Sequence, residues 1–171
     1  MNKKLLSIIS TAAAIVLALV MILLSEHNIK TARNNDELLD SGMDEIFALT
    51  DGMSESGNMP HTLEYLRQNR ERAQKAINDI RSVCDYYEKV TVPNKLRNQL
   101  TKVRAGIPAM RRFLDSYEKF FNSTLESEFR ENAIIAADLV DGMRESFYIA
   151  EKEFITQMNE LRHRKQGLLW L

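Results

Sequence analysis

The chain has 171 residues, with 23 Lys and Arg against 24 Asp and Glu, so its formal net charge is −1. This balance leaves no basic excess for a nucleic-acid backbone, and we expect no nucleic-acid partner. Six Gly and three Pro are few for a β-rich chain, and the single Cys84 excludes an intrachain disulfide.

Residues 5–24 form an uncharged, apolar run directly after Lys3 and Lys4. An α-helix of about 20 residues crosses the roughly 30 Å hydrocarbon core of a bilayer. The run is too long for the apolar part of a cleaved signal peptide, and the best cleavage position, at residues 23–25, carries a bulky Leu. We therefore predict an uncleaved transmembrane signal anchor over residues 5–24, with the lipid bilayer as its partner.

The charges that flank this run decide the predicted orientation. Two lysines precede the run, and Lys30 and Arg33 follow it, which gives no clear positive-inside bias. The short tail 1–4 with adjacent lysines is typical of a signal anchor. We therefore predict a single-pass membrane protein whose N-terminus is cytoplasmic and whose remaining chain is extracytoplasmic.

Apolar residues after the anchor recur at spacings of three and four over four stretches, which predicts four amphipathic helices. The first stretch extends from Ile29 to Met53 and has Asp36 at a seam position. Residues 54–60, which include Gly and Pro, then interrupt it. A polar seam residue such as Asp36 either fixes the helix register or reaches to the edge of the bundle.

The second stretch extends from Leu63 to Thr91 and places Arg70 and Cys84 in its apolar seam. Like Asp36, Arg70 either fixes the helix register or reaches to the edge of the bundle. Neither a His nor a cationic pocket accompanies Cys84, so we interpret this thiol as a small buried hydrophobe and not as a nucleophile.

The third stretch extends from Leu96 to Phe121 and contains Gly106 and Pro108. Proline removes a backbone donor and clashes with the preceding turn, so we expect a kink near residues 104–108, which is a structural kink or a hinge. Two pairs of adjacent aromatic residues cannot both face one seam, and we expect one member of each pair on the surface. These pairs are Phe120 with Phe121 and Phe147 with Tyr148.

The fourth stretch extends from Phe129 to Leu161, and we expect one long helix that reaches residue 166. Ser123 and Glu126 have the spacing of a capping box at its start. The apolar tail at residues 167–171 either rests on the bilayer surface or caps the end of the bundle.

Short connections between long helices favour antiparallel neighbours, so residues 25–166 are predicted to form an up-and-down, antiparallel four-helix bundle. Each helix has one apolar seam and needs the others to bury it. A three-helix bundle with a helical stalk is the alternative fold.

Two similar segments supply the candidate metal ligands. Residues 51–56 and 141–146 share five of six residues, and both contain two carboxylates four residues apart, Asp51 with Glu55 and Asp141 with Glu145. Four carboxylates at one level could bind a hard cation such as Ca²⁺. The other interpretation, which we favour, is that they are solvated faces beside buried methionines, so we predict no metal site. We predict no catalytic and no cofactor-binding residue.

A membrane span followed by a helical bundle is similar in layout to the sensor domains of bacterial chemoreceptors and sensor kinases. The apolar seams suggest no pocket of titratable groups, so we predict a protein that is not an enzyme. Our leading hypothesis is a membrane-anchored binding or scaffolding module of the cell envelope, with a protein partner or a homodimer. The alternative is an extracytoplasmic ligand-sensing bundle domain of a signalling system. An exposed apolar face would favour association, and a closed polar cavity would favour a small ligand.

Overall fold

The computed structural model describes residues 27, 30–53 and 59–168. The chain divides into two compact units, residues 1–34 and 35–171, and the described residues of the first unit are helical. The predicted anchor lies outside the described residues. None of the helices that the structure describes combines the length and the apolar character that a membrane crossing needs.

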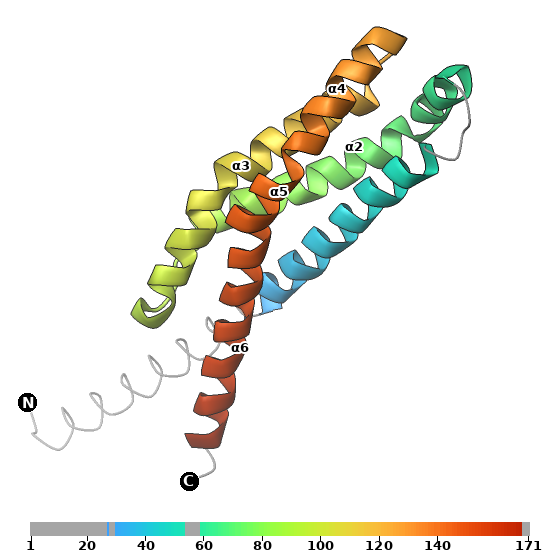
Figure 1. The fold of residues 1–171 in the computed structure, drawn as a ribbon. Helices are drawn as coiled ribbons and strands as arrows, with labels where there is room; N and C mark the ends of the chain where they lie inside the picture. The colour runs from blue at the N-terminus through green and yellow to red at the C-terminus, as the bar shows by residue number, and fades with distance from the viewer. Residues whose placement is uncertain (1–26, 28–29, 54–58, 169–171) are drawn as a thin grey trace, which may run out of the picture. The chain divides into compact units, whose positions relative to one another are not determined.

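The second unit is helical throughout its described residues apart from short connections, which confirms the predicted all-α class. Its described part begins with the helical residues 35–53, which are called the first helix below. The elements that follow it in Figure 1 are α2 (Met59–Lys89), the 3-10 turn η1 (Asn94–Leu96), α3 (Arg97–Phe121), α4 (Glu126–Asp138), α5 (Val140–Met143), the π-helical turn η2 (Arg144–Tyr148) and α6 (Ile149–Leu168).

Helix α3 is the central element of this helical bundle. It packs against α2 and also against α4, η2 and α6 (Figure 1). The apolar seam predicted for the third stretch is buried at all of its positions, which are Leu96, Leu100, Val103, Ile107, Met110, Leu114, Tyr117 and Phe121. The spacing of apolar residues therefore identified the face of α3 that the neighbouring helices cover.

The expectation for the first aromatic pair is wrong, because Phe120 and Phe121 are both buried. The Phe120 ring lies 5.2 Å from the ring of Phe129 in α4, whereas the Phe121 ring lies 6.1 Å from that of Tyr117. A helix with neighbours on two sides buries a face wider than one seam. The second pair follows the expectation in part, since Phe147 is buried and Tyr148 is half-buried and not fully on the surface.

The fourth stretch is a rod of several helical pieces, residues 126–168, and not the single regular helix that we expected. A turn at Leu139 ends α4, and a π-helical turn follows α5. In contrast, α3 continues through Pro108 as one helix. A Cβ added to Gly106 would overlap the backbone carbonyl of Ser146 in η2, so glycine is what allows α3 and the rod to touch backbone to backbone.

The predicted capping box at the start of the fourth stretch is also wrong. Helix α4 begins at Glu126, and the Glu128 carboxylate accepts a hydrogen bond from the backbone N–H of Leu125 at 3.3 Å. Leucine has no side-chain acceptor to complete a box. Ser123 instead donates to the Lys119 carbonyl at 3.1 Å, so it caps the end of α3.

The predicted break at residues 54–60 lies mostly outside the described residues, but its last two residues belong to α2. Pro60 is the second residue of that helix. The first turn of a helix tolerates proline because its N–H groups have no intrahelical partner. Pro60 therefore begins the next helix, and the predicted interruption extends two residues too far.

Candidate functional site: a buried carboxylate and an exposed apolar face

The most unusual residue of the core is Glu151 in α6, whose side chain is 0% exposed. One of its oxygens, Oε1, accepts a hydrogen bond of 2.6 Å from the Tyr87 hydroxyl of α2. The other oxygen, Oε2, is buried and has no hydrogen-bond partner among the described residues. A buried carboxylate with one unsatisfied oxygen is costly and calls for a specific explanation.

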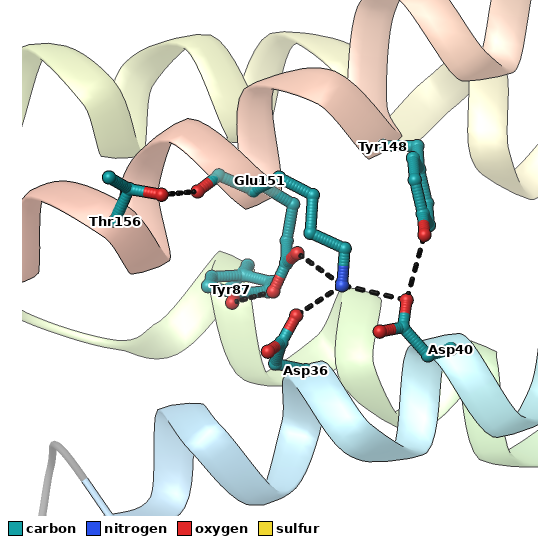
Figure 2. A network of polar contacts seen from close by, with 7 residues as sticks. Asp36, Asp40, Tyr87, Tyr148, Glu151 and Thr156 are labelled. Carbon is teal, nitrogen blue, oxygen red and sulfur yellow. Dashed lines mark hydrogen bonds and ion pairs between the residues drawn. The ribbon is translucent and has the colours of Figure 1, made fainter. Parts of the chain in front are cut away.

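The neighbouring Lys152 connects α6 to the first helix, on which Figure 2 labels Asp36 and Asp40. Its ammonium group forms ion pairs with Asp36 and with Asp40, the latter at 2.7 Å, and lies 3.8 Å from Oε2 of Glu151. The Tyr148 hydroxyl donates to the Asp40 carboxylate at 2.9 Å. Three carboxylates on two helices therefore share one ammonium group.

Burial has different outcomes at Glu151 and Lys152. It is the main influence on the pKa of the Glu151 carboxyl group, whereas ion pairs outweigh it at the Lys152 ammonium group. Burial raises the pKa of Glu151 to about 7, although the hydrogen bond from Tyr87 acts in the opposite direction. Burial would lower the pKa of Lys152, but the bonds to Asp36 and Asp40 outweigh it and raise that pKa. The lysine is thus permanently charged, and the glutamic acid changes its charge near neutral pH.

Tyr87 is held in place from several directions. From α3, the Arg104 guanidinium donates to the backbone carbonyls of Tyr87 at 2.8 Å and of Val90 at 2.7 Å. The Tyr87 ring meets the rings of Phe147 and Phe154 edge-on, with centroids 6.3 Å and 5.6 Å apart. These contacts fix the hydroxyl that donates to the buried carboxylate.

This arrangement is suited to holding charge and a proton. No solvent reaches Glu151, so a substrate has no access to its carboxylate in this conformation. A protonated Lys152 is neither a base nor a nucleophile. An open groove of about 640 Å³ lies beside the cluster, and its lining, which includes Gln99, Arg144, Tyr148, Lys152 and Glu153, mixes both charges. It is not the closed cavity that would favour a small ligand.

The acidic residues proposed from the sequence lie elsewhere. Asp51, Asp141 and Glu145 are exposed. Within the described residues no group of three His, Cys, Asp or Glu side chains could hold a metal ion. Glu55 lies outside the described residues, so the choice between the two interpretations of the four carboxylates is not tested.

The structure agrees better with the interpretation of the three seam residues Asp36, Arg70 and Cys84. Cys84 is fully buried, and burial raises the pKa of its thiol to about 12, which confirms its interpretation as a buried hydrophobe. Arg70 is half-buried, and its Nε has no hydrogen-bond partner in the described part of the chain. Asp36 is ion-paired with Lys152, as a polar seam residue that fixes helix contacts would be.

Sequence reasoning missed Glu151. The residue follows Phe147 by four positions and precedes Phe154 by three, which is the spacing of a seam residue. The same seam passes equally regularly through Ala150, and an acidic residue beside it is normally solvated. The one indication of burial in the sequence is that Glu151 fits the spacing of the apolar seam as well as Ala150 does.

A second feature is the outer face of the rod at α4 and α5. Ala136 is the one buried residue of α4. Ile134 is 64% exposed and Ile135 is 45% exposed. We call their surroundings the acidic–apolar face, which consists of the exposed residues Glu131, Ile134, Ile135, Asp138 and Asp141. Exposed apolar side chains that lie next to one another and are flanked by polar residues can mark an interaction site.

Comparison with protein-family models, with curated proteins and with solved structures finds no match for this chain.

Proposed function

We propose that this protein is a non-enzymatic, membrane-anchored helical binding module that acts at the cell envelope through the acidic–apolar face. The observation that carries the proposal is the exposure of Ile134 and Ile135 on α4, a helix that buries only Ala136. Leu125, just before α4, is a third exposed large hydrophobic residue in this region. Apolar anchors of this kind supply most of the affinity in helix-mediated recognition.

The charges around the face specify the chemistry of the partner. Residues 126–143 contain five carboxylates and one guanidinium group. That guanidinium, from Arg130, is already paired with Glu126 at 2.7 Å. In the described part of the chain, Glu131, Asp138 and Asp141 form no ion pair. A second copy would bring like charges together, whereas an amphipathic helix with basic flanks would complement them. We therefore propose a protein partner with a basic amphipathic helix.

The setting of this module is part of the proposal. A signal anchor over residues 5–24 would leave the N-terminus in the cytoplasm and place an up-and-down four-helix bundle outside it. The support is the length and apolar character of that segment. The face would then project from the membrane into the envelope.

A peptide-binding experiment tests the proposal. The full-length protein in a non-ionic detergent is titrated with a labelled synthetic helix of about 18 residues that has a Leu face flanked by Lys and Arg, and fluorescence anisotropy reports binding. We expect the double variant Ile134→Ser/Ile135→Ser to bind at least about tenfold more weakly, because two apolar anchors are removed. Micelles without protein supply the background.

The matched control is Ile149→Ser, which removes an exposed isoleucine from outside the face and should leave binding unchanged. A peptide with Glu in place of its basic residues should bind poorly. Equal binding by the double variant would contradict the proposal. So would a dimer, detected by light scattering, that the double variant loses, because the face would then belong to a second copy.

One observation favours the second candidate function, an extracytoplasmic ligand-sensing bundle domain. Lys152 of α6 is tied to Asp36 and Asp40 at the N-terminal end of the first helix. A sensor needs such a contact between its first and last helices, since these would lead to and from the membrane. The contact would be the place where a signal changes the packing of the bundle.

A further inference from the structure

We propose that the cluster of Asp36, Asp40, Tyr87, Glu151 and Lys152 is a proton-operated latch between the first helix and α6, closed when Glu151 carries a proton and weakened when Glu151 is ionised. The latch concerns a different part of the molecule from the acidic–apolar face. It therefore stands or falls independently of the proposed binding function.

The number of carboxylates around one ammonium group gives the latch its two states. With Glu151 neutral, Lys152 is shared by Asp36 and Asp40 only. With Glu151 ionised, three carboxylates compete for a single ammonium group. The ionised Oε2 needs a donor, and Lys152 Nζ at 3.8 Å is the cation that already faces it. Any movement of Nζ toward Glu151 lengthens its bonds to the first helix.

The remaining groups around Glu151 do not supply a second cation. From α2, Tyr87 donates one hydrogen bond to Oε1. From η2, the Tyr148 hydroxyl is directed to Asp40. From α3, the Arg104 guanidinium is directed to backbone carbonyls at the end of α2. Within the described residues, Lys152 is therefore the one cation that pairs with this cluster.

The proton affinity of the buried carboxyl group places the change in an accessible pH range. Burial raises the pKa of Glu151 to about 7. Below that pH the carboxyl group is neutral and the latch is closed. Above it the buried negative charge is present, and the attraction between Lys152 and the first helix is divided. The contact should therefore loosen as pH rises through neutrality.

Hydrogen–deuterium exchange of the full-length protein tests the latch. Exchange of residues 35–53 is followed by mass spectrometry at about pH 6 and about pH 8, with labelling times scaled for the intrinsic pH dependence of exchange. In the wild type we expect protection of this segment to fall by roughly tenfold between these pH values. Glu151→Gln keeps a neutral side chain at both, so its protection should stay high at both.

The controls separate a titrating latch from a merely structural contact. Glu160→Gln makes the same change at an exposed position of α6 and should behave as the wild type does. Tyr87→Phe removes a hydrogen bond that favours the ionised carboxylate, so the midpoint of the change should move to higher pH. Protection that is equal at both pH values in the wild type, or a fall that persists in Glu151→Gln, would overturn the proposal. If Glu151→Gln does not fold, an unchanged midpoint in Tyr87→Phe would overturn it.

Discussion

The two ends of the rod at residues 126–168 differ sharply, although both have apolar residues at helical spacing. The α6 end buries Ala150, Glu151, Phe154, Ile155 and Met158. The α4 end buries only Ala136 and leaves two isoleucines exposed. The α6 end contacts α3 and the first helix, whereas α4 packs on α3. The number of neighbours, and not the local pattern, decides which apolar residues become core.

The largest change in the free energy of unfolding is expected from a substitution at the contact between α3 and the rod. Gly106→Ala should lower the free energy of unfolding by about 3 kcal/mol, because the added Cβ overlaps backbone atoms of Ser146 that cannot rotate away. Gly142→Ala is the matched control, since a Cβ there meets no atom within 4 Å. It should raise stability by about 0.5 kcal/mol through helix propensity. Chemical denaturation followed by circular dichroism measures both, and equal effects would contradict the assigned backbone contact.

The pH dependence of stability sharpens the comparison at the α6 end. The pKa of Glu151 is about 7 in the folded protein against an ordinary value of 4.5, so between these values the folded state holds a proton that the unfolded state has lost. The free energy of unfolding should therefore fall as pH rises from about 4.5 to about 7, by at most about 3 kcal/mol, and then level off.

The variant Glu151→Gln should lack this fall and should be more stable than the wild type above neutral pH. Denaturation curves of both proteins between about pH 5 and about pH 8 make the comparison. A wild-type stability that rises with pH over this range would show that the carboxyl group is not held neutral by burial.

A smaller effect is expected at the beginning of the α4 end. Glu128→Ala should cost about 1 kcal/mol, because the Glu128 carboxylate accepts the backbone N–H groups of Thr124 and Leu125 ahead of α4. Glu131→Ala alters an exposed carboxylate of the same helix and should be nearly neutral. Thermal unfolding of the two variants distinguishes them, and an equal loss in both would rule out a capping role.

The smallest effect on stability is expected on the acidic–apolar face itself. Ile134→Ser should change the free energy of unfolding by no more than about 0.5 kcal/mol, since most of this side chain is already in water. Ile155→Ser, at a buried position of α6, should cost several times more. If Ile134→Ser destabilises the protein as strongly as Ile155→Ser does, then Ile134 is part of the core and not of a binding face.

The sequence predicted most of the helical framework. The periodicity of apolar residues correctly predicted the buried seam from Leu96 to Phe121 and the buried Cys84 in α2. A spacing of three and four residues places side chains on one side of any α-helix. The prediction misplaced the cap of α4 and missed the break in the fourth stretch. Caps depend on single hydrogen bonds, and the break lies where the rod meets Gly106 of another helix.

By itself, the sequence determined that this chain is helical and which side of each helix is apolar, since both follow from residues a few positions apart. Only the tertiary structure decided which polar residues meet. Asp36 and Lys152 are 116 positions apart, and no local pattern relates them. The exposure of Ile134 was likewise decided in three dimensions, because an apolar side chain is buried only where another helix covers it.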